Sequence, residues 1–147
     1  MQSSWIFVLN LAATWYMVGL IWMVQIVHYP LFDRVGEPGF KRYEADHNRL
    51  ITPIVGLPML IEIATAFALL AYAPTGFPSW AAMLGVGLLG MIWLSTALIQ
   101  VPCHSQLAGG FDESVHRRLV MSNWIRTLAW SARGLLVGYF ALKLIQR

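Results

Sequence analysis

The four histidines of this chain each lie close to one end of a long apolar run. His28 and His104 follow the first and third runs, in the stretches VQIVHYP and QVPCHSQ, whereas His47 and His116 precede the second and fourth runs. Imidazole nitrogens bind transition metals, and they also exchange protons near neutral pH. A histidine at the same end of every run predicts one shared polar rim.

Three kinds of chemistry fit such a rim. The first is a mononuclear iron, copper or zinc site. The second is haem, with rim histidines as axial ligands and arginines on the propionates. The third uses no metal, and a histidine is the general base for an acidic aromatic substrate. The candidate metal ligands are His28, His47, His104, His116 and Glu44, which stands three residues before His47 on one helical face. The candidate cofactor-binding residues are His28, Gln100, His104 and His116.

Three ionisable residues lie inside the apolar runs, where a charge marks a candidate functional site by default. Glu62 lies 15 residues after His47, and Arg126 and Arg133 lie 10 and 17 residues after His116. At 1.5 Å per residue, Glu62 falls at a depth between the two arginines, so we expect it to pair with one of them. The other arginine would attract a carboxylate or phenolate. The candidate catalytic residues are Glu62, Asn123, Arg126 and Arg133.

The composition predicts that lipid surrounds most of the chain. Of its 147 residues, 58% are hydrophobic and 12% are charged, and the mean hydropathy is +0.61. A soluble domain carries about twice that charged fraction. Four runs have the roughly 20 residues that a spanning helix needs, at 5–27, 52–73, 80–100 and 121–145. We therefore predict one all-α domain over residues 1–147, an integral membrane four-helix bundle.

Further elements are expected in the polar connections. Residues 39–50 (GFKRYEADHNRL) predict an extra short helix in the first polar loop, ended by Pro53. Asp112 is the predicted N-cap of the fourth helix, which then starts before its apolar run. The single cysteine, Cys103, excludes an intrachain disulfide.

Basic residues predict the orientation, because lysine and arginine are enriched in cytoplasmic loops. Six of them lie on the polar-loop face and two on the face of the termini, which puts the loops in the cytoplasm and the termini outside. The six are Arg34, Lys41, Arg42, Arg49, Arg117 and Arg118, and the two are Lys143 and Arg147. The expected partners are membrane lipid, a lipid-soluble small molecule and, as an open option, further copies of this chain. Nucleic acid is excluded, because the basic residues do not cluster with aromatic ones.

Each predicted helix also carries a polar stripe. Asn10, Thr14, Gln25 and His28 lie within about 60° of one another on the first helix, at 100° per residue. In lipid such stripes must face each other, because unpaired polar groups cost several kcal/mol there. The sequence thus predicts a polar interior that opens toward the histidine rim.

Two resemblances rest on short motifs. His28 and Pro30, then Pro102, His104 and Leu107, then the NWIRT stretch from Asn123 to Thr127 are similar to motifs of the anthrone oxygenase-like four-helix membrane family. That resemblance implies cofactor-poor oxygenation of polycyclic phenols. The stretches TWYMVGLIWMVQIVHYPLF and RLITPIVGLPM resemble the HemJ-type protoporphyrinogen oxidases, which implies an association with haem.

The expected function is a membrane oxidoreductase or oxygenase that acts on a lipid-soluble aromatic or quinol-like substrate, at a histidine-lined metal or haem site near the cytoplasmic face. The alternatives are a small transporter, or a structural subunit of a membrane complex held together by a buried Glu–Arg network. A transport path requires polar residues that reach both faces, whereas the apolar stretch at residues 82–91 closes one side.

Overall fold

The computed structural model describes residues 2–146, with side chains from residue 4 onward, and every regular element in this range is helical. The elements are α1 (Gln2–Met23), η1 (Val24–His28), η2 (Pro30–Arg34), α2 (Glu37–Ala71), α3 (Ser79–Ser95), η3 (Thr96–Gln100), α4 (Val101–Leu107) and α5 (Glu113–Ile145). They form four continuous helices, Ser4–Arg34, Glu37–Ala71, Ser79–Leu107 and Glu113–Ile145, each long and apolar enough to cross a membrane. The predicted all-helical class with four such helices is confirmed.

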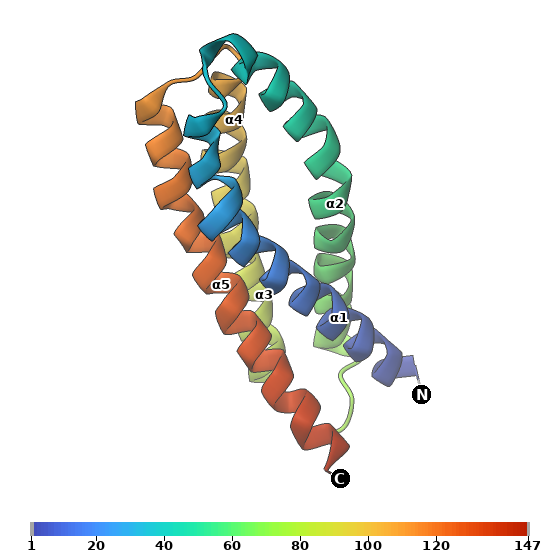
Figure 1. Ribbon diagram of the computed structural model, residues 1–147. Helices are drawn as coiled ribbons and strands as arrows, with labels where there is room; N and C mark the ends of the chain where they lie inside the picture. Colours follow the sequence, from blue (N-terminus) through green and yellow to red (C-terminus); the bar gives the residue numbers. More distant parts are fainter. Residues whose placement is uncertain (1, 147) are drawn as a thin grey trace.

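The four helices run up and down beside one another (Figure 1). The termini and the short α2–α3 connection lie at one end of the bundle, whereas the η2–α2 and α4–α5 connections lie at the other. α1 packs against α2 and α5, and α3 also packs against both. Arg147, which the basic-residue count assigned to the terminal end, lies outside the described residues, and the orientation across a membrane stays a prediction.

Two π-helical turns distinguish the histidine end. In η1 the Tyr29 N–H bonds to the Val24 carbonyl, and in η3 the Val101 N–H bonds to the Thr96 carbonyl, each five residues back. Pro30 or Pro102 follows each turn. Proline lacks the N–H that would bond to the carbonyl four residues earlier, and the wider turn accommodates that loss. The π turns therefore explain how a glutamine, a histidine and a proline close each apolar run.

α2 differs from the sequence prediction, because the helix expected at residues 39–50 does not end at Pro53. It forms the first turns of α2, which continues through Pro53 and Pro58 and bends along its length (Figure 1). An interior proline removes one donor, and its ring crowds the carbonyl four residues earlier, which accounts for the bend. The Thr52 hydroxyl donates to the Asn48 carbonyl at 2.6 Å. Rim residues and the deep Glu62 thus share one helix.

α5 begins where the sequence predicts. The Asp112 side chain accepts hydrogen bonds from the backbone N–H groups of Ser114 and Val115, at 2.8 and 3.0 Å. Those bonds and one from the Ser114 hydroxyl lower the pKa of the Asp112 carboxyl. They satisfy two of the donors that a helix N-terminus leaves free.

The outer surface is strongly apolar. Trp5 is 69% exposed, Leu57 63% and Leu135 70%. So much exposed apolar area is unfavourable in water, whereas lipid chains solvate it. Inside, a large cluster surrounds Trp130 and Phe32, and a smaller one at the terminal end joins Phe7, Phe77 and Phe140. The exposed apolar surface therefore supports the prediction that this is a membrane protein.

α1 and α5 approach each other closely at Gly134. A Cβ added there would lie 2.9 Å from Val18 Cγ2, whereas one at Gly138 would meet its nearest atoms, on Trp15, at 3.5 Å. Replacing glycine by alanine in a helix gains about 1 kcal/mol of propensity, and overpacking costs about 1–3 kcal/mol. Gly134→Ala should therefore have a lower Tm in mild detergent than Gly138→Ala, as measured by circular dichroism. Equal Tm values would mean that the helices separate there without cost.

Candidate functional site

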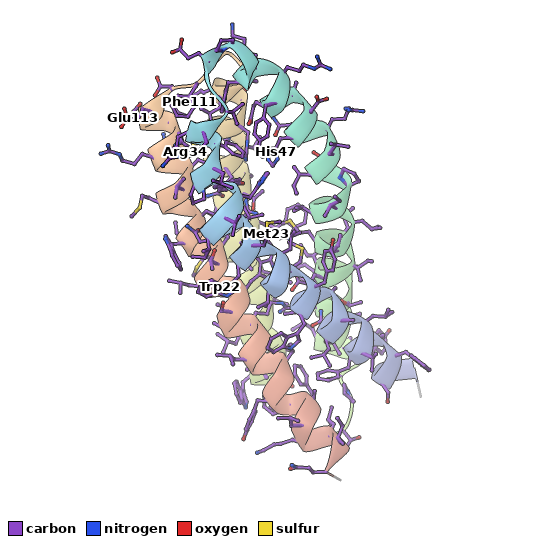
Figure 2. The ribbon with its side chains drawn as sticks, viewed as in Figure 1. Trp22, Met23, Arg34, His47, Phe111 and Glu113 are labelled. Carbon is purple, nitrogen blue, oxygen red and sulfur yellow. The ribbon has the colours of Figure 1, made fainter. Side chains whose placement is uncertain are left out.

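The structure brings three of the four predicted rim histidines into one cluster. His28 Nε2 lies 2.9 Å from His47 Nδ1, so one ring donates to the other, and the rings of His47 and His104 lie 5.1 Å apart. Figure 2 shows His47 between α2 and the remaining helices. His116 stacks on the far side of Phe32 and donates from Nε2 to the Tyr29 carbonyl at 2.7 Å. The rim is thus a cluster of three histidines with His116 beside it.

A carboxylate holds His104 in place. Glu44 Oε1 lies 2.6 Å from His104 Nδ1, and the other ring nitrogen lies 2.9 Å from the Tyr29 hydroxyl. Asn48 donates to the same carboxylate oxygen at 3.1 Å. A carboxylate on one imidazole nitrogen fixes the orientation of the ring and the position of its proton. Tyr29 was absent from the sequence prediction, although it stands between His28 and Pro30 in a motif that the prediction used.

The two glutamines of the π turns join helices. Gln25 accepts a hydrogen bond from Asn123 at 3.0 Å and donates to the Val120 carbonyl at 3.1 Å. Gln100 accepts from Ser95 and donates to Ser122, at 3.0 and 3.1 Å. Gln100 was predicted to bind a cofactor, and Asn123 was predicted to act in catalysis. In the structure, their hydrogen bonds connect α5 to η1 and to η3.

A cavity of about 480 Å³ lies beside the histidine cluster, between α2, the α3–η3–α4 helix and α5. Most of its lining is apolar. Three buried polar atoms on its lining residues have no hydrogen-bond partner within residues 2–146: His47 Nε2, Trp93 Nε1 and Arg126 Nε. Buried polar groups are nearly always paired in folded proteins. Three such atoms on the lining residues of one cavity make it the candidate ligand site.

Arg126 is the strongest of these groups. Its side chain is buried, and the structure gives it no ion pair within residues 2–146. The guanidinium lies 5.3 Å from the centre of the Trp130 ring, and the Tyr29 hydroxyl lies beside it. A buried cation without an acid is costly, so this position favours an anionic ligand group.

Glu62 and Arg133 form a separate, closed network deeper in the bundle. Glu62 accepts from Thr14 at 2.7 Å, from Trp130 at 2.9 Å and from Arg133 Nε at 2.9 Å. Arg133 also donates to Asn10 at 2.9 Å. Both oxygens of the carboxylate are thus satisfied, and α1, α2 and α5 meet at this point.

Gly85 makes room for this arginine, because a Cβ there would lie 2.7 Å from Arg133 Nη1. Of the two partners expected for Glu62, the structure selects Arg133. Arg126 is the arginine left over, and it lies on the cavity. The surplus positive charge expected from the sequence is therefore next to the histidine cluster.

The histidine nitrogens are largely committed to protein groups. His28 and His47 share a hydrogen bond, both nitrogens of His104 are occupied, and His116 bonds to a carbonyl. Within residues 2–146 no three His, Cys, Asp or Glu side chains are grouped so that they could hold a metal ion. In this arrangement the donor set of His28, His47, His104, His116 and Glu44 does not fit a three-ligand metal site. Metal and haem stay predictions.

No family model, curated protein or solved structure matches this chain.

The closed network predicts a large effect of neutralising Glu62. Glu62→Gln should lower the Tm in detergent markedly, because breaking a buried pair by removing one partner costs about 3–5 kcal/mol. The matched control is Glu113→Gln, which removes an exposed carboxylate that lies 3.4 Å from Arg117 and should leave the Tm nearly unchanged. A Tm for Glu62→Gln equal to that of the control would mean that the Glu62 charge contributes nothing to stability.

Proposed function

We propose that this chain is a membrane-embedded oxidoreductase that binds a lipid-soluble phenol or quinol in the cavity beside Arg126 and His47. The observation that carries this proposal is that three residues lining one mainly apolar cavity each have a buried polar atom without a partner among the described residues. A phenol presents a flat apolar body and one acidic oxygen, which matches such a lining.

Arg126 would hold the ionised oxygen. Its guanidinium carries a permanent positive charge, and charge-assisted hydrogen bonds are stronger than neutral ones. Trp93 lines the same cavity, and its N–H is a further donor without a partner among the described residues. Removing the proton of a bound phenol would give Arg126 the negative partner that it lacks among the described residues.

His47 would take that proton. When its Nδ1–H donates to His28, its Nε2 is an acceptor without a partner among the described residues, and His47 lines the cavity. The proton bound at Nε2 is balanced by transfer of the Nδ1 proton to His28, which is only partly buried. His104 is less suited as the base, because Glu44 and Tyr29 occupy both of its nitrogens.

The redox step needs an oxidant, and dioxygen is soluble in lipid. A quinol that is oxidised to a quinone loses two electrons and two protons. Dioxygen that accepts the two electrons and the two protons becomes hydrogen peroxide. The role of the chain's own residues is to bind the substrate and accept its first proton. The resemblance to the anthrone oxygenase-like family supports a phenolic substrate, and the resemblance to HemJ-type proteins supports haem.

The closed Glu62–Arg133 network favours an enzyme over a transporter. It lies between the cavity and the terminal end, where Phe7, Phe77 and Phe140 pack together. Satisfied groups and aromatic rings provide no polar path to that end. The alternative of a structural subunit predicts no binding of small molecules, so the experiments below separate it from an enzyme.

The first experiment measures binding of 4-nitrophenol, whose phenolate has its own visible absorbance band, to the protein in mild detergent. Arg126→Gln should raise the Kd about 10–100-fold, because hydrogen bonds to charged groups contribute about 1.5–3 kcal/mol. Arg126→Lys keeps the positive charge but loses the planar guanidinium, so its Kd should lie between those of the wild type and Arg126→Gln. Arg117→Gln, exposed on the same helix, is the control. An unchanged Kd in a folded Arg126→Gln protein would refute the proposed binding site.

The second experiment measures dioxygen uptake with a hydroquinone as substrate. His47→Gln should lower the turnover about 10²–10⁴-fold, the usual contribution of a general base, while the Kd for 4-nitrophenolate changes little. Arg49→Gln, an exposed change on the same helix, should leave both values intact. Turnover by His47→Gln at the wild-type rate would exclude His47 as the base.

The metal and haem predictions are tested by an absorption spectrum and elemental analysis of the same preparation. A Soret band at stoichiometric haem would favour the HemJ-like alternative. Stoichiometric iron, copper or zinc without that band would mean that the rim side chains rearrange around a metal.

A further inference from the structure

We propose that the ligand enters this cavity sideways from the lipid, between α2 and the η3–α4 segment, and that it is an amphiphile with a long apolar chain. Its acidic head lies at Arg126, its chain follows α2 toward Met59, and Gly56 sets the width of the entrance. This inference rests on the proposed function and adds the substrate class and its route.

The shape of the cavity supports a long ligand. Its lining on α2 extends from His47 to Met59, which corresponds to about 18 Å at 1.5 Å per residue. His47 and His104 belong to the histidine cluster, and Arg126 lies beside Tyr29, which bonds to His104. The lining also includes Asn48, Thr52, Thr96, Gln100 and Ser105, but most of its surface is apolar, as at Val55 and Met59. A cavity with this polarity fits a molecule with one polar end.

The mouth of the cavity faces the surface that is expected to meet lipid. Thr52 on α2 and Val101 on α4 line the cavity and are exposed, Val101 by 58%. Leu57 on α2 and Leu98 on η3 are 63% and 67% exposed. In Figure 1, α2 bows away from α4, and residues of both helices line the cavity. A ligand dissolved in lipid can therefore reach Arg126 without crossing water.

Gly56 lies on this route. It lines the cavity, and a Cβ added there would meet no atom within 4 Å. A side chain at this position can therefore start without a clash, and a large one would occupy space in the cavity. Gly90 on α3 is a matched control, because a Cβ there also meets nothing within 4 Å and because it lies outside this cavity.

The test compares two probes, 4-nitrophenol and its 2-dodecyl derivative, on protein in phosphatidylcholine nanodiscs. Gly56→Phe should raise the Kd of the dodecyl probe at least about 10-fold, as expected when a bulky group fills an occupied site. The Kd of 4-nitrophenol should change less than about 3-fold, and Gly90→Phe should alter neither. Val101→Trp narrows the mouth from the opposite side, so it should slow the association of the dodecyl probe, measured as kon by stopped flow, more than that of 4-nitrophenol. This readout tests the entrance even if Gly56→Phe does not fold.

The outcomes separate this inference from the proposed function. If Arg126→Gln weakens the binding of both probes while Gly56→Phe leaves the Kd and Val101→Trp leaves the kon of the dodecyl probe unchanged, the phenol site stands and the lateral entrance is wrong. The entrance is also wrong if both substitutions weaken the two probes equally, because the head site is then the part that they obstruct. If Arg126→Gln weakens neither probe, the proposed function fails as well.

Discussion

The pairing of polar groups inside a chain that exposes mainly apolar side chains is the constraint on which the bundle depends. A polar group on the outside would face lipid, where an unsatisfied donor or acceptor costs several kcal/mol. The Glu62 carboxylate meets this constraint with donors from Thr14, Trp130 and Arg133. Because these donors come from α1 and α5, the same contacts fix the relative depth of α1, α2 and α5.

At the histidine end of the bundle, fewer of the buried polar groups are paired. Glu44, His104 and Tyr29 form a hydrogen-bonded chain, and the glutamines of the π turns connect α5 to η1 and η3. Yet Arg126 Nε, His47 Nε2 and Trp93 Nε1 are buried without partners among the described residues. The polar groups are thus fully paired around Glu62 and incompletely paired on residues that line the cavity.

Composition and residue spacing were sufficient to predict four long apolar helices, the Asp112 cap and a grouping of histidines at one end. These features depend on local chemistry: apolar runs of about 20 residues, a side chain that accepts from nearby N–H groups, and polar residues at the ends of such runs. The polar stripe of α1 was also informative, because Asn10 and Thr14 both contact the Glu62 network. Periodicity predicted that these residues face inward.

The tertiary structure alone decided which polar groups pair. Arg126 and Arg133 lie on the same helix, and Glu62 was expected at a depth between them, so only the packing of α3, where Gly85 leaves room, selects Arg133. The continuity of α2 through Pro53 and the two π turns were likewise invisible in the sequence pattern. A proline specifies a missing hydrogen bond, and the surrounding packing decides whether the helix ends, bends or widens there. The cavity between α2 and α4 depends on the bend of α2 and on the π turn before α4.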